Sequence, residues 1–313
     1  MLKSMLSLSV TQKASDLHLS SGEAPCIRVN GQLKFLSEDK LSPVELEIKL
    51  LNLLEQPQID ILKQSGQIDL TYHLVEVGRF RVNIFYQQRG ISAVFRIINH
   101  RIPTLSEINA PNIFKDLAVI ESGIILVTGA TGSGKTTTLA SLIQYINSTV
   151  AKHIITLEDP IEYIYQNDKS LIQQCEVINF TSAIDSLLRQ DPDILLLGEL
   201  RNKRSIQAAL TAAETGHLVF ATLHTSSAIQ TINRIIDVFE YGSRDFIRSQ
   251  LSNSLKAIIN QKLIPIENGR KALFEVLINT SAVSNLINEG KIKQIFSLMQ
   301  NGQQYGMQVM PDC

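Results

Sequence analysis

One stretch of the chain, Gly129–Thr136, has the residue types and spacing of a loop that binds phosphate groups. It reads Gly-Ala-Thr-Gly-Ser-Gly-Lys-Thr and matches the pattern G-x-x-x-x-G-K-[ST]. Glycines let the backbone curl so that several N–H groups point at phosphate oxygens, and the following helix adds its positive N-terminal end. In such a loop the lysine reaches the β- and γ-phosphates, and the final threonine hydroxyl coordinates Mg²⁺. We therefore predict that the chain binds ATP and Mg²⁺ through Gly129, Thr131, Gly132, Ser133, Gly134, Lys135, Thr136 and Thr137.

Two groups of carboxylates follow short apolar runs. Hydrolysis needs a group that orients or deprotonates water beside the γ-phosphate, and the end of a strand next to the phosphate loop is the expected place. Glu199 follows the run Ile194–Leu197, so we predict that it is the catalytic carboxylate; the alternative is a helix cap or a surface glutamate. The segment Thr156–Glu162 carries three carboxylates after a second run. These residues either hold hydrated Mg²⁺ or form an ordinary polar turn.

Two histidines, His217 and His224, bracket a third apolar run, Leu218–Thr222. A lone histidine usually has a structural role. A pair that brackets a strand beside a phosphate site can instead sense the γ-phosphate or relay a change. The pattern alone leaves both interpretations open.

The elements that must position these residues begin near residue 110. Continuous apolar runs at Ile124–Val127, Ile154–Leu157, Ile194–Leu197 and Leu218–Ala221 are typical of fully buried parallel strands. Helical patterns lie between them, at Thr137–Ile146 and Thr181–Arg189. Strands that alternate with helices predict an α/β domain whose parallel sheet has helices on both faces. Beyond about residue 228 the pattern predicts a mostly helical region.

The first hundred residues have a different pattern, typical of a smaller α+β domain. Phe80, Val82 and Ile84 alternate with more polar residues, as a half-buried strand does, and Ala93, Phe95 and Ile97 repeat the pattern. A length of 313 residues suits two domains. We expect an N-terminal domain over 1–100, a linker over 101–110 beginning near His100, and an ATPase domain over 111–313.

The composition narrows the class of protein. The formal net charge of −1 argues against a motor that grips nucleic acid, which often carries a basic excess. Cys26, Cys175 and Cys313 form no C-x-x-C pair, so neither a disulfide framework nor a zinc site is expected. No apolar run approaches the roughly 20 residues of a membrane-spanning helix. We expect a cytoplasmic protein whose membrane contact is peripheral or through a partner.

Taken with the phosphate loop, a series of motifs resembles the secretion and type IV pilus ATPase superfamily, and within it the twitching-motility, pilus-retraction branch. The resemblance covers nearly the whole chain. Its motifs are Ala14–Leu19, Ile27–Gly31, Gly78–Asn83, Ala93–Arg96, Thr156–Glu162, Asp191–Asp193, Gly198–Arg201, Thr211–His217, Leu223–Thr225 and Tyr305–Gln308.

The resemblance implies a PAS-like N-terminal domain joined to a RecA-like P-loop ATPase domain. It also implies a homo-hexamer that acts on an inner-membrane pilus platform protein, beside a paralogous pilus ATPase in some systems. By likeness, Glu199 is the catalytic glutamate and Glu158 belongs to the magnesium and water network. His217 and His224 become functional, and Arg79, Arg81 and Arg96 stabilise the phosphoryl group during transfer.

Two departures from the branch leave alternatives. Ser284 and Asn288 stand where retraction ATPases usually carry arginines, and Asn202 stands where the family usually has aspartate. The chain is thus either a divergent retraction motor or an auxiliary one. An assembly or type II secretion ATPase is the main rival, but such proteins usually carry a four-cysteine zinc segment, and residues 226–290 contain no cysteine. A nucleic-acid translocase and a regulatory subunit that does not hydrolyse ATP are weaker rivals.

Overall fold

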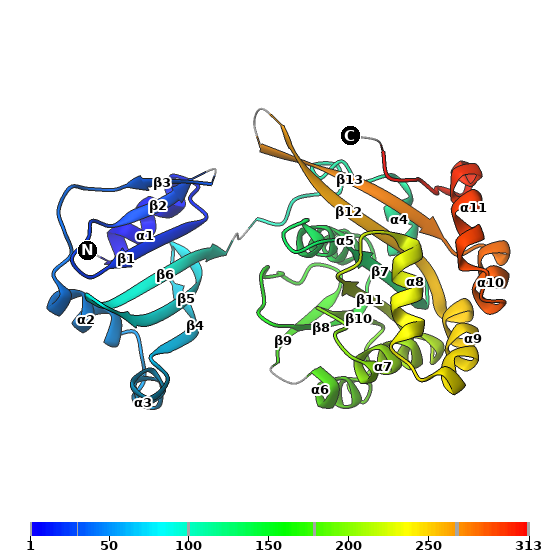
Figure 1. Cartoon of the computed structure of the whole chain (residues 1–313), viewed down its shortest axis with the longest axis horizontal. Helices are drawn as coiled ribbons and strands as arrows, with labels where there is room; N and C mark the ends of the chain where they lie inside the picture. Colours follow the sequence, from blue (N-terminus) through cyan, green and yellow to red (C-terminus); the bar gives the residue numbers. More distant parts are fainter. Residues whose placement is uncertain (1, 30, 99–100, 178–179, 267–268, 312–313) are drawn as a thin grey trace. The chain divides into compact units, whose positions relative to one another are not determined.

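The computed structural model describes residues 2–29, 31–98, 101–177, 180–266 and 269–311. The chain divides into two compact units, Met1–Arg101 and Ile102–Cys313 (Figure 1). Residues 102–110, which the sequence pattern assigns to a linker, fall in the second unit, where Leu105 is buried in a core with Phe114. His100, where the expected linker begins, lies outside the described residues.

In its described residues, the first unit consists of a six-stranded sheet and three helices. The strand order is β3-β2-β1-β6-β5-β4, and all neighbours are antiparallel. Phe80, Val82 and Ile84 are fully buried, as the alternating pattern predicts. The elements are α1 (Leu2–Thr11), β1 (Asp16–Ser20), β2 (Cys26–Val29), β3 (Gln32–Phe35), α2 (Pro43–Leu51), α3 (Gln56–Ser65), β4 (Gln67–Leu74), β5 (Gly78–Gln87) and β6 (Gly90–Ile98).

The second unit is built on a seven-stranded sheet with the order β13-β12-β7-β11-β10-β8-β9. The four apolar runs singled out in the sequence form parallel strands at its centre, which confirms the prediction. Among the described strands of this sheet, only β13 runs antiparallel to its neighbour. The strands are β7 (Gly123–Thr128), β8 (His153–Glu158), β9 (Leu171–Glu176), β10 (Ile194–Leu197), β11 (Leu218–Leu223), β12 (Leu255–Ile266) and β13 (Gly269–Ile278).

Successive residues of each central strand enter two different cores. In β7, Ile124 and Leu126 pack on one face of the sheet, and Ile125 and Val127 pack on the other. Helices α4 (Ile113–Ala118) and α5 (Lys135–Thr149) cover the second face. Because both faces are buried, the strands are apolar throughout instead of alternating. The first face is covered by α6 (Phe180–Leu187), α7 (Lys203–Glu214), α8 (Ala228–Asp237), α9 (Arg244–Ser254), α10 (Ser281–Asn288) and α11 (Ile295–Asn301).

The prediction of a mostly helical region beyond residue 228 is wrong for residues 255–266 and 269–278, which form the long antiparallel strands β12 and β13 (Figure 1). A short apolar run such as Ala257–Ile259 does not by itself distinguish a strand from a buried helix. Its partner decides, because β12 pairs with β7 and extends the sheet. The backbone groups along that edge of β7 would otherwise be buried without hydrogen bonds.

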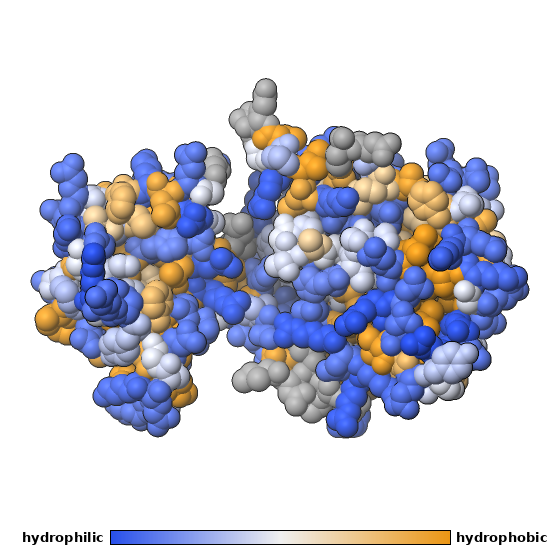
Figure 2. Space-filling model, viewed as in Figure 1, coloured by the Kyte–Doolittle hydropathy of each residue, from blue (hydrophilic) through white to orange (hydrophobic). Residues whose placement is uncertain are grey.

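The surface carries both polar and apolar side chains, and two of the three cysteines lie in the described part of the chain. The face drawn in Figure 2 is largely hydrophilic, with apolar patches between the polar side chains. Within the described residues, no helix is both long and apolar enough to cross a bilayer. Cys26 and Cys175 are free thiols, and Cys313 lies outside the described residues.

Candidate functional site

The phosphate loop lies between β7 and α5, at the carboxyl edge of the parallel sheet. Its three glycines have positive φ angles: 144° at Gly129, 77° at Gly132 and 89° at Gly134. Only glycine adopts such angles readily. A side chain at Gly129 would also collide with the backbone oxygen of Gln261 on β12. The loop conformation therefore requires these glycines, for the reason that the motif predicts.

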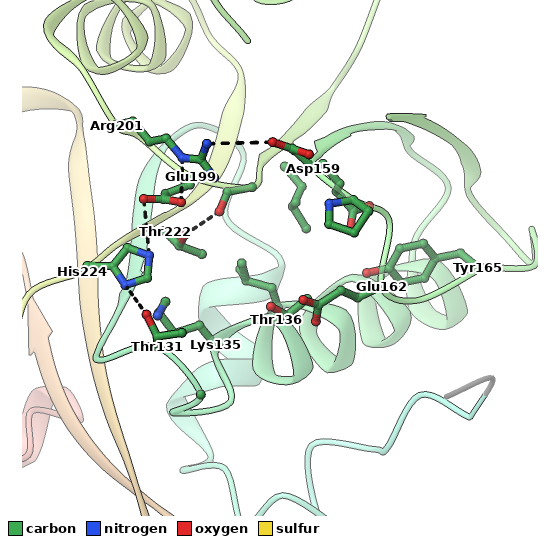
Figure 3. Close-up of a pocket in the computed structure, with 16 residues that line it drawn as sticks. Thr131, Lys135, Thr136, Asp159, Glu162, Tyr165, Glu199, Arg201, Thr222 and His224 are labelled. Carbon is green, nitrogen blue, oxygen red and sulfur yellow. Dashed lines mark hydrogen bonds and ion pairs between the residues drawn. The ribbon is translucent and has the colours of Figure 1, made fainter. Parts of the chain in front are cut away.

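A pocket opens above this loop and the first turn of α5. Figure 3 shows Thr131, Lys135 and Thr136 along the lower side of the pocket, Glu199 and Arg201 above them, and His224 between Glu199 and Thr131. The remaining lining comes from the ends of β8, β10 and β11 and from the segment after β8. The pocket is lined by Thr131, Gly132, Lys135, Thr136, Leu139, Glu158, Asp159, Pro160, Glu162, Tyr165, Leu196, Gly198, Glu199, Arg201, Thr222 and His224.

Lys135 is held by the loop itself. Its Nζ donates hydrogen bonds to the backbone oxygens of Gly129, at 2.8 Å, and Ala130, at 2.9 Å. Burial lowers the pKa of this ammonium, while the charges of Glu199 and Glu162 oppose the shift. The lysine thus presents a partly desolvated positive charge at the pocket floor, where an anionic group is favoured.

Some of the other predicted loop residues line the pocket, and the rest support the conformation of the loop from outside it. Ser133 is buried, and its Oγ has no hydrogen-bond partner within the described residues. Thr137 does not line the pocket, and its hydroxyl forms a hydrogen bond with that of Tyr163 at 3.0 Å. Gly129 and Gly134 shape the backbone without lining the pocket. An unpaired hydroxyl and a buried cation in one loop suit a ligand rich in acceptor oxygens.

Glu199 connects two other groups of the pocket. Its Oε2 accepts a hydrogen bond from Nε of Arg201 at 2.9 Å, and its Oε1 lies 3.3 Å from Nε2 of His224. Arg201 also lies 3.8 Å from a carboxylate oxygen of Asp159, and the Glu199 carboxylate raises the pKa of the guanidinium. His224 Nδ1 lies 3.5 Å from Oγ1 of Thr131, back in the phosphate loop. These contacts link Thr131, His224, Glu199, Arg201 and Asp159 in a chain along one side of the pocket (Figure 3).

Glu158 lines the pocket from the end of β8. It is only 6% exposed, and its Oε1 accepts hydrogen bonds from Thr156 Oγ1, at 2.8 Å, and Gln174 Nε2, at 3.2 Å. Burial raises its pKa, although these hydrogen bonds oppose the shift. This carboxylate is therefore a positioned pocket residue rather than part of a solvated turn. Thr136 and Glu158 both line the pocket, as a shared magnesium site would require.

The two histidines lie at opposite ends of β11. His224 follows the carboxyl end and enters the pocket. His217 precedes the amino end, where its Nδ1 lies 3.0 Å from the Ala212 oxygen and 3.2 Å from Thr215 Oγ1. A six-residue strand spans roughly 20 Å. Of the two predicted histidines, His224 lines this pocket and His217 does not, and a functional role for His217 stays a prediction.

The predicted arginines belong to the first unit. Arg79 and Arg81 lie on β5, and Arg96 lies on β6 directly opposite Arg81, so these two share one face of the sheet. Arg96 donates from Nε to an Asp16 carboxylate oxygen at 3.0 Å. The pocket described above is lined by residues of the second unit only.

Tyr165 and Arg201 line the pocket but were not predicted as site residues, and Asp159 and Glu162 were predicted only as members of the acidic cluster Thr156–Glu162. A signal for the acids was present, because the cluster after β8 contains three carboxylates. Arg201 lies in the Gly198–Arg201 motif, but its pairing with Asp159 depends on the packing of β8 beside β10. Within the described ranges, no three His, Cys, Asp or Glu side chains are grouped so as to hold a metal ion by themselves.

The structure shows the surroundings of Ser284 and Asn288, the two residues that stand where the retraction branch usually has arginines. Ser284 on α10 donates a hydrogen bond to the backbone oxygen of Ser252 on α9 at 2.9 Å, so it helps to dock the two helices. Asn288 is exposed at the end of α10.

Comparison with known proteins gives consistent matches along the chain. The family model described as type II/IV secretion system protein matches residues 1–274. The type IV pilus retraction ATPase PilT of Pseudomonas aeruginosa is 44% identical over 99% of this chain and 91% of its own length. A twitching motility protein of Neisseria gonorrhoeae is 46% identical, with coverages of 95% and 83%. The crystal structure of the pilus retraction motor PilT with bound ADP superimposes with a TM-score of 0.90 at 42% identity, covering 95% of this chain and 89% of that one. The predicted α/β class is thereby confirmed.

Proposed function

This chain belongs to the family of type II/IV secretion system proteins, and from that premise we propose that it is an ATPase motor that drives type IV pilus retraction. The proposal depends on one observation: nearly the whole chain is similar in sequence to a pilus retraction ATPase and to a twitching motility protein. The phosphate loop, Lys135 and Glu199 meet in one pocket, as such an activity requires.

The pocket residues have distinct parts in ATP hydrolysis. The loop amides and Lys135 bind the phosphate chain, and Glu199 orients and deprotonates the attacking water. His224 contacts both Glu199 and Thr131, so it is placed to report the state of the terminal phosphate. Arg201 holds the Glu199 carboxylate in place.

The residues present also fit a magnesium ion bound together with the nucleotide. Thr136 offers a hydroxyl and Glu158 a carboxylate, which are the hard oxygen donors that Mg²⁺ prefers. When bound, the ion neutralises phosphate charge as the terminal phosphoryl group is transferred. Because protein side chains alone do not form a complete site, the remaining ligands are expected from phosphate oxygens and water.

We propose the assembly that performs the mechanical work from the similarity of the chain to pilus retraction ATPases. We expect six copies in a ring, acting on a platform protein of the inner membrane from its cytoplasmic side. Arg79, Arg81 and Arg96 are proposed to stabilise the charge of the transferring phosphoryl group. A paralogous pilus ATPase is a further expected partner.

A pilus assembly or type II secretion ATPase is the second candidate, because the family model also describes type II secretion system proteins. The absence of cysteine between residues 226 and 290 favours retraction, since a four-cysteine zinc segment is usual in the assembly branch. A nucleic-acid translocase is disfavoured by the net charge of −1.

A genetic experiment tests the proposal. Deletion of the gene is expected to increase the number of surface pili and to abolish twitching, because pili would still be assembled but not withdrawn. Complementation with the native gene should restore both properties, and complementation with the Glu199→Gln variant should restore neither. Loss of pili on deletion would identify an assembly motor instead. Unchanged pili and twitching would overturn the assignment to pilus biology.

A further inference from the structure

The hairpin β12–β13 brings polar side chains from the end of the chain to the carboxyl edge of the sheet. Asn260 on β12 pairs in register with Thr128, the last residue of β7 before the phosphate loop. On its other side, Asn260 pairs with Glu275 of β13. Both Asn260 and Glu275 are buried, although they lie at positions where a core strand usually has apolar residues.

The Asn260 amide connects two segments of the pocket. Its Nδ2 donates to Oγ1 of Thr128 at 2.8 Å and to the backbone oxygen of Thr225 at 2.9 Å. A backbone oxygen can only accept, so the contact with Thr225 determines which side of the amide faces it. One NH₂ group therefore bridges the base of the phosphate loop and the turn that follows β11.

That turn carries His224, and its other end is also anchored by the hairpin. The Glu275 carboxylate accepts a hydrogen bond from the backbone N–H of Ala228 at 2.5 Å, at the start of α8. Asn260 at Thr225 and Glu275 at Ala228 thus hold the turn at two points. His224, one residue before Thr225, contacts Glu199 and Thr131 across the pocket.

Building on the proposed ATPase function, we propose that Asn260 is a positioning residue for hydrolysis: its bridge from Thr128 to Thr225 fixes His224 relative to the phosphate loop and Glu199. Asn260 does not line the pocket, so it acts through His224 and not on the nucleotide. Small displacements of catalytic groups have large effects on rate. A side chain that holds two catalytic segments in register therefore controls turnover more than nucleotide affinity.

A second buried asparagine provides a matched comparison. Asn279 also donates twice from Nδ2, to the backbone oxygens of Ser252 and Leu255, both at 2.9 Å. Oδ1 of each asparagine lacks a partner among the described residues. Asn279 lies just beyond β13, beside the start of β12, at the opposite end of the sheet from the pocket. The two amides make similar bonds, but only that of Asn260 joins pocket segments.

The test is a double-mutant cycle in the full-length protein, with kcat, ADP affinity and thermal unfolding measured for each variant. Asn260→Ala is expected to lower kcat by about tenfold or more while leaving ADP affinity within about twofold. Asn279→Ala should lower the unfolding temperature comparably with little change in kcat. Because Asn260 acts through His224, Asn260→Ala should lower kcat by no more than about twofold further when His224 is already alanine.

Three results would overturn the inference. The first is an unchanged kcat in Asn260→Ala, and the second is a loss of kcat in Asn279→Ala as large as that in Asn260→Ala. The third is a double variant whose fold loss of kcat equals the product of the losses in the Asn260 and His224 single variants. The last would mean that Asn260 acts independently of His224. Failure of the proposed function is a separate result, because it would appear as an absence of ATP turnover in the native protein.

Discussion

Replacing Glu199 by glutamine removes one negative charge from the pocket and leaves most of its geometry intact. Glutamine keeps a carbonyl oxygen that can accept the hydrogen bond from Nε of Arg201, which lies 2.9 Å from the carboxylate in the native protein. It is a much weaker base than carboxylate. We expect ATP turnover to fall by about 10²- to 10⁴-fold, the range for loss of a general base. That fall corresponds to about 3–5 kcal/mol of activation free energy.

The cost to folding should be much smaller. Glu199 contacts Arg201 and His224, and the Arg201 side chain is 60% exposed. Solvent-exposed ion pairs of this kind contribute about 0.2–1 kcal/mol each. The free energy of unfolding should therefore fall by less than about 2 kcal/mol, or a few degrees in unfolding temperature for a unit of roughly 200 residues. Since the catalytic effect exceeds the effect on stability, the two can be separated.

The assay is phosphate release at saturating ATP, with retention of labelled ATP and thermal unfolding measured on the same samples. Glu240→Gln is a matched control, because Glu240 pairs with Lys203 at 3.1 Å outside the pocket. We expect the Glu199 variant to retain bound ATP without hydrolysing it and the control to behave as the native protein does. Turnover within about threefold of native in Glu199→Gln would refute the assignment of Glu199 as the base.

Three further outcomes are expected. Lys135→Ala should weaken ADP binding by about 10- to 100-fold in a fluorescence titration, because charge-assisted hydrogen bonds are lost; unchanged affinity would contradict the loop assignment. Burial holds the pKa of Glu158 above its ordinary value, so the folded protein binds a proton at this carboxyl more tightly than the unfolded chain does. The resulting contribution to the free energy of unfolding is fully present below about pH 4 and is lost as the pH rises through the raised pKa. Glu158→Gln should therefore raise the unfolding temperature at neutral pH but not at about pH 4, and a pH-independent difference would argue against this. Gly129→Ala should destabilise the chain by about 1–3 kcal/mol more than Gly216→Ala, because both have positive φ but only a side chain at Gly129 meets backbone; equal shifts in denaturant midpoint would exclude this explanation.

Local chemistry was readable from the sequence alone. The phosphate loop is a continuous segment whose glycines are required by its positive φ angles. Its motif can therefore be recognised in the sequence without knowledge of the fold. The central strands were also predictable, because burial on both faces leaves a continuous apolar run. Glu199 and the acidic cluster Thr156–Glu162 were predicted for a related reason: each lies at or just beyond the end of such a strand, and the carboxyl ends of parallel strands share one edge. The choice of Glu158 within that cluster depended on the family resemblance.

Interactions between distant segments were decided by tertiary structure. The run at Ala257–Ile259 became a strand because the edge of β7 was available to pair with it. His217 and His224 were equivalent in the sequence, but the direction of β11 brings only His224 to the pocket. Asn260 had no local signal at all, since its partners Thr128 and Thr225 lie 132 and 35 residues away. The sequence by itself determined which segment can cradle phosphate. The packing of the sheet decided which side chains surround that segment, because hydrogen bonds between strands join residues without regard to their separation along the chain.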